Sequence, residues 1–218
     1  MITLLIPLLL HASFAAQATQ GAAPAEKMIK ERGGKFVKPL DEITWVDLFA
    51  TRVSDDDLAS LRNLEYLTKL GLGHTSISDN GLAHLSGLKR IRFLSLSKTK
   101  ITDKGLKSVR PMQMMSALSL DETTITDAGL SELSSLKKLI WLSLSHTQVT
   151  DTGLTHLRDM NLAHLELAHT AVSDKGMKEI ASHKRLGWLE LADTSVGDKG
   201  LKELADLKEL TTLLSTSS

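Results

Sequence analysis

The sequence predicts an α/β solenoid in which a curved parallel β-sheet forms the concave face and short helices form the convex face. Three observations predict it: an internal repeat of about 24 residues, a short alternating apolar segment in every copy, and an aliphatic composition. Aromatic residues make up 4% of the 218 residues and hydrophobic residues 42%, so leucine must supply most of the core. Repeats of this size cannot bury their apolar faces alone, and they therefore stack on one another.

The repeat is clearest in an octet that begins with threonine and ends in Gly-Leu. The octet TSISDNGL begins at Thr75, and related octets begin at Thr99, Thr123, Thr147, Thr170 and Thr194. Successive starts are 24, 24, 24, 23 and 24 residues apart. A weaker copy begins 24 residues earlier at Thr51, with Asp57 in place of the glycine. Seven clear repeats and a partial eighth are therefore predicted to fill residues 43–218.

Each copy predicts one short strand. Upstream of each threonine lies the pattern L-x-x-L-x-L-x-x-T, as in Leu67, Leu70, Leu72 and Thr75. The L-x-L part alternates apolar and variable residues, which is typical of a strand with one buried face. The residues before and after the second leucine should then point away from the core.

Each copy also predicts one short helix. An aspartate lies four residues after each threonine and precedes an L-x-x-L-x-x-L stretch, in which leucines such as Leu130, Leu133 and Leu136 share one helix face. We expect each carboxylate to cap the first free N–H groups of its own helix and to complement the helix dipole. These aspartates are Asp79, Asp103, Asp127, Asp151, Asp174 and Asp198.

The pattern L-x-x-L-x-L-x-x-T-x-I-T-D-x-G-L resembles the leucine-rich repeats of the ribonuclease-inhibitor and cysteine-containing classes, with Thr where the latter place Cys or Asn. The repeats are similar to those of F-box leucine-rich-repeat proteins, although residues 25–40 are too few to hold an F-box. A closer resemblance is to secreted bacterial leucine-rich-repeat proteins in which a short helix and a turn, here Gly33-Gly34-Lys35, precede the first repeat. The resemblance covers residues from about Ile43 onward and implies a leucine-rich-repeat solenoid that binds a ligand.

The N-terminal segment predicts export. Residues 1–18 combine an apolar stretch from Ile2 to Leu10 with a small-residue triplet at Ala16 to Ala18, which is typical of a signal peptide. The alternative is a mature N-terminal helix, because no Lys or Arg precedes the apolar stretch. We expect a flexible leader over residues 19–25, an N-terminal cap over 26–42 with a helix at Glu26–Arg32, and a secreted or periplasmic location.

Composition excludes several kinds of partner. Lys+Arg and Asp+Glu are equal at 26 each, so the chain lacks the broad positive charge that nucleic-acid and anionic-membrane binders use. The apolar stretch at residues 2–10 is shorter than the roughly 20 residues of a membrane-spanning helix. With no cysteine, neither a disulfide nor a thiolate metal site can form.

Function is predicted to reside in the variable positions of the concave face. The column before the second leucine contains all three tryptophans of the chain, and the column after it is acidic at both ends and small in the middle. The predicted ligand-binding residues are Trp45, Asp47, Phe93, Trp141, His164, Glu166, Trp188 and Glu190. A strip of rings beside carboxylates suits a protein or peptide ligand, a basic side chain, or a sugar face. The alternative is that these aromatic residues only shield the twisted sheet near its ends.

Other chemistry is less well supported. His146 and His169 share a column with His74 and Asp193; a metal pair is conceivable there, but we expect solvated loop histidines. His183 takes a position filled elsewhere by leucine, which predicts a half-buried packing residue.

No nucleophile motif or phosphate-binding glycine loop occurs, so no catalytic, metal or cofactor site is predicted. A hydrolase that uses Glu166 and Glu190 is the enzyme alternative. The sequence also stops within an eighth strand, which predicts self-association or fraying at the C-terminal edge, where Leu213 lies.

Overall fold

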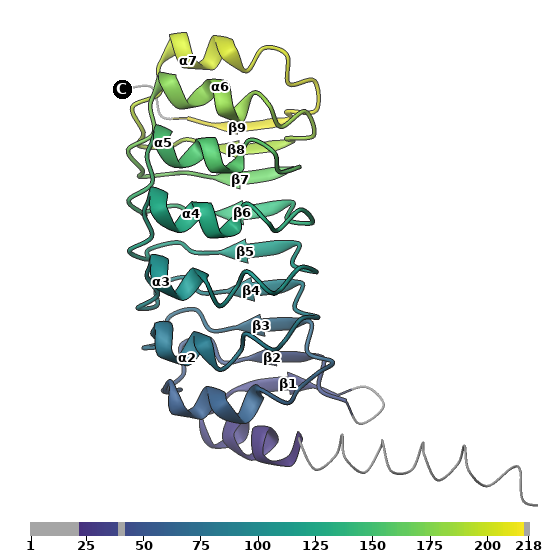
Figure 1. Ribbon diagram of the computed structural model, residues 1–218. Helices are drawn as coiled ribbons and strands as arrows, with labels where there is room; N and C mark the ends of the chain where they lie inside the picture. The colour runs from purple at the N-terminus through teal and green to yellow at the C-terminus, as the bar shows by residue number, and fades with distance from the viewer. Residues whose placement is uncertain (1–21, 39–41, 216–218) are drawn as a thin grey trace, which may run out of the picture.

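The fold is that of an elongated α/β solenoid. The computed structural model describes residues 22–38 and 42–215, so the predicted signal peptide lies outside the described residues. Nine strands lie in sequence order in one sheet, and the helices cover one side of that sheet (Figure 1). Strands β2 to β9 are parallel, and β1 pairs antiparallel with β2. The predicted solenoid of stacked strand and helix units is confirmed.

The strands are three residues long, and in β2 to β8 the central residue is fully buried while the first residue is half-buried or exposed. This alternation puts the middle side chain into the core and the outer two on the opposite face. The strands are β1 (Lys35–Val37), β2 (Trp45–Asp47), β3 (Lys69–Gly71), β4 (Phe93–Ser95), β5 (Ala117–Ser119), β6 (Trp141–Ser143), β7 (His164–Glu166), β8 (Trp188–Glu190) and β9 (Thr212–Leu214).

The helical segments are short, and they alternate with the strands. They are a first helix over residues 22–31, then η2 (Asp56–Leu61), α2 (Asp79–Ala83), α3 (Asp103–Leu106), α4 (Asp127–Leu133), α5 (Asp151–Leu154), η3 (Thr155–Leu157), η4 (Asp174–Gly176), α6 (Met177–Ile180) and α7 (Asp198–Glu203). No helix within residues 22–38 and 42–215 is long and apolar enough to cross a membrane.

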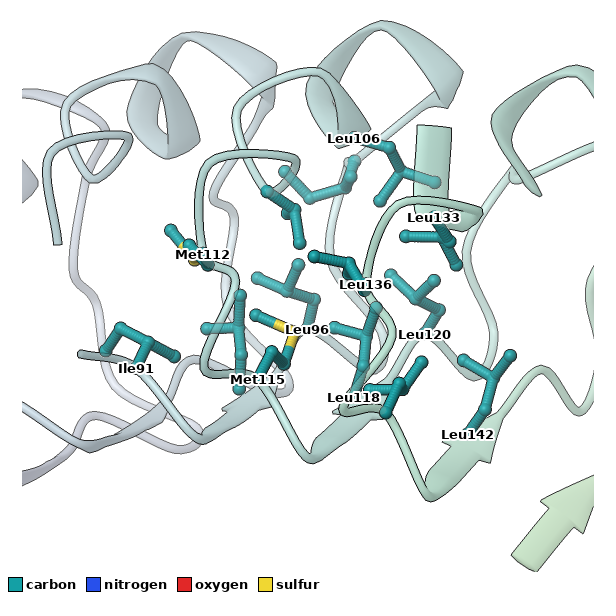
Figure 2. Close-up of a cluster of buried hydrophobic side chains, with 14 of the residues drawn as sticks. Ile91, Leu96, Leu106, Met112, Met115, Leu118, Leu120, Leu133, Leu136 and Leu142 are labelled. Atoms are coloured by element: carbon teal, nitrogen blue, oxygen red, sulfur yellow. The ribbon is translucent and has the colours of Figure 1, made fainter. Parts of the chain in front are cut away.

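The core is a continuous stack of aliphatic side chains between sheet and helices. Leu118 and Leu142 come from the strands, Leu106 and Leu133 from the helices, and all four are fully buried (Figure 2). Because equivalent leucines follow one another at the spacing of the strands, each repeat covers the apolar surface of its neighbour.

The N-terminal cap is longer than the sequence indicated. The first helix spans residues 22–31, so it begins inside the segment expected to be a flexible leader over residues 19–25. Ala22 and Ala25 are buried with Ile29, which explains why these small residues are ordered in a helix. Helix and antiparallel β1 together shield the first repeat, as a terminal cap must.

The aspartates of the repeat bond to the next repeat, and this corrects the expectation that they cap their own helices. Each is the first residue of its helix, and the preceding Ser or Thr is the N-cap where a side-chain cap is present. The Asp103 carboxylate accepts a hydrogen bond from the Thr126 backbone N–H at 2.9 Å and one from the Thr126 hydroxyl at 2.7 Å. The same hydroxyl accepts from the Ala128 N–H at 3.2 Å, so the Asp103 carboxylate orients the cap of α4.

The same link joins each pair of neighbouring repeats from η2 to α7. Paired residues are Asp55 with Ser78, Asp79 with Thr102, Asp103 with Thr126, Asp127 with Thr150, Asp151 with Ser173, and Asp174 with Gly197 and Gly200. The glycine two residues after each aspartate from Asp79 to Asp198 is required by this packing, because it lies against the aspartate of the preceding repeat. A Cβ at Gly129 would overlap the Oδ1 atom of Asp103 in the preceding repeat.

We predict that Asp103→Ala and Gly129→Ala are non-additive. Asp103→Ala removes two hydrogen bonds from Thr126 and should lower the free energy of unfolding by about 1–3 kcal/mol. Gly129→Ala should be destabilising by a similar amount, roughly 1–3 kcal/mol, because the new methyl meets the carboxylate. The double variant should be less destabilised than the sum by about 1 kcal/mol, since the overlap is gone. Chemical denaturation of the four proteins measures this; strict additivity would contradict the contact.

His183 is buried, with 2% of its surface exposed, where the sequence predicted a half-buried residue. It fills the core position that Leu136 holds in an earlier repeat, and its Nδ1 atom lies 2.9 Å from the Met160 carbonyl oxygen. Burial lowers the pKa of His183, although the Met160 carbonyl and the charge of Glu179 oppose this shift. The neutral imidazole is therefore the form that the fold accommodates.

We predict that His183→Leu changes how the free energy of unfolding depends on pH. Because the pKa is lower in the folded state, the unfolded chain binds the proton more readily, and stability is lost as the pH falls below about 6.5. Leucine cannot bind a proton. The stability of the variant relative to that of the natural protein should therefore increase as the pH falls from 8 to 5. Urea denaturation at both pH values checks this. An unchanged difference between the two proteins would show that His183 is not held neutral.

Candidate functional site

The face of the sheet that lies opposite the helices, called the open sheet face below, carries side chains in straight columns. Strand pairing in register aligns the first residue of every strand from β2 to β9. This first column reads Trp45, Lys69, Phe93, Ala117, Trp141, His164, Trp188 and Thr212, as the sequence predicted.

Four rings of the first column form a continuous aromatic strip over β4 to β8. The centroids of Phe93 and Trp141 are 6.5 Å apart with an interplanar angle of 27°, and the two rings meet across the small side chain of Ala117. The His164 ring lies 5.6 Å from that of Trp141 and 5.1 Å from that of Trp188, to which it is nearly parallel at 7°. The register of the strands therefore sets the spacing of these rings.

Carboxylates lie beside this strip in the second column. Glu166 is held from two sides, by the Ser143 hydroxyl at 2.6 Å and by His164 Nε2 at 2.5 Å. Ser143 is fully buried, so its hydroxyl fixes the carboxylate from below. For Glu190 the structure shows no hydrogen-bond or ion-pair partner within the described residues. Both carboxylates are half-buried on the same face as the rings.

A third column, which the sequence analysis missed, adds Asp121 to the site. Asp121 accepts hydrogen bonds from the Ser119 hydroxyl at 2.8 Å and the Ser145 backbone N–H at 3.0 Å, and it also bonds to the buried Ser143 hydroxyl. It lies two residues beyond the end position of β5, so the alternation of the strand, continued for one more step, would have found it.

Other predicted site residues lie apart from this cluster. Trp45 and Asp47 are on β2, and Lys69 and Gly71 of β3 lie between them and β4. The Asp47 carboxylate accepts a hydrogen bond from the Phe49 backbone N–H at 3.0 Å, which gives it a local structural role. The structure thus brings Phe93, Trp141, His164, Glu166, Trp188 and Glu190 into one region and leaves Trp45 and Asp47 at the N-terminal end of the sheet.

A left-handed backbone position follows every strand from β2 to β8. Ala50, His74, Lys98, Glu122, His146, His169 and Asp193 have φ between 52° and 57°. Such residues cost about 1–2 kcal/mol each unless the surrounding structure holds them. Here the backbone N–H donates to a carbonyl of the following repeat, as in His74 to Ser97 at 2.8 Å.

The loop histidines are in contact with one another rather than simply solvated. The rings of His146 and His169 stack with centroids 4.0 Å apart, and His169 Nε2 lies 3.1 Å from an Asp193 carboxylate oxygen. In the described part of the chain no group of three or more His, Cys, Asp or Glu side chains is arranged to hold a metal ion. A surface pocket of about 600 Å³ lies between the first repeats, lined by residues that include Asp55, His74 and His84, and no ring of the aromatic strip lines it.

Comparisons with known proteins agree with this architecture. A family model described as Leucine Rich repeat matches residues 91–109 and 158–181. Internalin C2 from Listeria monocytogenes has a similar solved structure, with 24% identity, 89% of this chain and 92% of that chain covered, and a TM-score of 0.68. A second internalin (inlF) of Listeria monocytogenes is 19% identical with a TM-score of 0.56, and the match covers 80% of this chain and 54% of that one. No curated protein sequence matches this chain.

These likenesses concern the repeats and the fold. The matched family model covers two stretches of the chain, and both solved structures are below 25% identity. Together with the repeat pattern and the nine-stranded sheet, they show that this chain folds as a leucine-rich-repeat solenoid.

Proposed function

We propose that the chain is a non-catalytic binding module that holds a protein or peptide partner on its open sheet face. The observation that carries this proposal is the aromatic strip, in which Trp141, His164 and Trp188 lie side by side on adjacent strands. Tryptophan is enriched among residues that dominate binding energy at protein interfaces. The leucine-rich repeats and the internalin-like fold support a protein-interaction role.

A purely structural role for the rings explains less of their arrangement. The side chains of Trp141, His164 and Trp188 are only half-buried, so each leaves ring surface open on the sheet. Because neighbouring strands fix their positions, little ordering entropy is lost when a partner binds. The surface is therefore suited to binding more than to filling space.

A glycan ligand is the second candidate. Flat indole rings beside carboxylates suit the apolar face of a sugar and its hydroxyl groups. Glu190, with no partner in the described structure, supplies a free hydrogen-bond acceptor for such a ligand. A glycan array probed with the intact chain separates this candidate from a protein ligand, since a protein-binding module gives no consistent sugar signal.

A hydrolase that uses Glu166 and Glu190 receives less support. Both Glu166 oxygens are already engaged, one by Ser143 and one by His164, which suits a fixed acceptor more than a proton donor. The repeats and the internalin-like fold also point to a binding scaffold.

We predict that Trp188→Ala weakens binding of the protein partner by more than tenfold. Truncating a buried interface tryptophan often costs about 2 kcal/mol or more, and about 1.4 kcal/mol corresponds to a factor of ten. Capture of partners with the natural protein and with the Trp141→Ala/Trp188→Ala double variant tests the proposal most directly. We expect the natural protein to retain partners that the double variant loses.

Leu165→Ala is the matched control for these variants. Leu165 is fully buried behind the strand that carries His164, so its truncation should cost roughly 2–5 kcal/mol of stability and leave the open sheet face chemically intact. If the partner binds Trp141→Ala, Trp188→Ala and Glu190→Ala as tightly as the natural protein, the open sheet face is not its binding site.

We also propose that the protein is exported to the periplasm or the exterior, with residues 1–18 removed as a signal peptide. The apolar stretch and the small-residue triplet ending at Ala18 support this proposal. N-terminal sequencing of the exported protein should begin at Thr19. A sequence that begins at Met1 would contradict cleavage.

Self-association through β9 is a further prediction. Leu213 and Leu214 are 39% and 42% exposed, and apolar residues beside a strand edge favour pairing with another chain. Light scattering should detect an oligomer that Leu213→Lys weakens. A protein that stays monomeric at high concentration would rule the oligomer out.

A further inference from the structure

We infer that the region over β5 to β8 of the open sheet face recognises an arginine side chain of the partner. This inference rests on the proposed function and gives the partner a definite chemistry. It combines the charge of the face, the way its carboxylates are held, and the aromatic strip beside them.

The first observation is a charge imbalance confined to this face. Among the described residues of its three columns there are four carboxylates, from Asp47, Asp121, Glu166 and Glu190, and one basic residue other than histidine, Lys69. In the whole chain acidic and basic residues are equal at 26 each. Lys69 is on β3, two strands from β5 and therefore about 10 Å away, so it does not neutralise Asp121 or Glu166.

The second observation concerns the groups that position the carboxylates over β5 to β8. Within the described residues, none of these groups is a Lys or Arg side chain. The partners of Asp121 are serine hydroxyls and the Ser145 backbone N–H. The partners of Glu166 are the Ser143 hydroxyl and the His164 ring. The buried Ser143 oxygen lies within hydrogen-bond distance of both carboxylates, so the two lie close to each other, and its single hydroxyl proton is donated to one of them at a time. Two held carboxylates beside Glu190 make a fixed negative site that a cation completes.

The third observation is the ring surface beside that site. A guanidinium group is planar, stacks on an indole, and donates to carboxylates from its edge at the same time. His164 stacks on Trp188 and contacts Trp141 at a tilt of 43°, while its Nε2 atom lies 2.5 Å from a Glu166 carboxylate oxygen, so the rings and this carboxylate are in direct contact. Lysine offers a compact charge without the plane, which makes arginine the better match.

The test uses a short peptide with a matched uncharged analogue. The intact chain is titrated calorimetrically with acetyl-Gly-Arg-Gly-Arg-Gly-amide and with the same peptide containing citrulline, which keeps the planar shape and loses the charge. The arginine peptide should bind at least tenfold more tightly. Its affinity should fall several-fold between about 20 mM and about 200 mM ionic strength, because exposed charges are screened.

Two variants locate the site. Glu190→Gln and Glu166→Gln should each weaken the arginine peptide by about tenfold, as expected for loss of a charged hydrogen-bond acceptor. Glu203→Gln is the control, because it makes the same change of charge at an exposed residue of α7 rather than on the open sheet face. This variant should bind the peptide like the natural protein. Thermal unfolding of all three confirms that the fold is retained.

The outcomes separate this inference from the proposed function. The inference is overturned if the arginine and citrulline peptides bind with equal affinity, or if neither peptide binds detectably. It is also overturned if Glu166→Gln and Glu190→Gln have no effect. If a protein partner is still lost with Trp141→Ala/Trp188→Ala in that case, the binding module stands with a different ligand chemistry. If neither the partner nor the peptide depends on the face, both proposals fall.

Discussion

The whole structure depends on bonds that each repeat makes to the next one. The carboxylate of Asp103 bonds to Thr126 of the following repeat, and equivalent pairs recur from η2 to α7. On the sheet side of the repeat, the strand and the left-handed residue after it form backbone hydrogen bonds to the following repeat. A single repeat would leave these polar groups without partners, so stability belongs to the interfaces between repeats.

This constraint also produces the candidate site. Because the links recur at almost constant spacing, every strand starts in the same register, and residues far apart in sequence become neighbours in a column. Trp141, His164 and Trp188 owe their contact to that register alone. The buried leucines behind them are equivalent from repeat to repeat, whereas the outward residues differ, so the scaffold and the proposed recognition surface are encoded at separate positions.

Much of this could be predicted from the sequence, since the period fixes which residues share a column. The aromatic strip and the Glu166 and Glu190 pair were found in this way, but Asp121 was missed because only the residues on either side of the second leucine were read as outward-facing, and Asp121 lies beyond the end of β5. The bond from Asp103 to Thr126 could not be foreseen, because an aspartate at a helix start is equally suited to capping its own helix. Nor could the ordering of residues 22–25, where Ala22 and Ala25 become buried only through tertiary packing.

Neighbouring repeats build a preorganised aromatic strip on the open sheet face. Proton NMR of the free protein measures this directly through nuclear Overhauser effects between the His164 ring and the two indoles. We expect contacts from His164 to both Trp141 and Trp188, together with upfield ring-current shifts of the imidazole protons. Imidazole protons with unshifted resonances and no contact to either indole would contradict it.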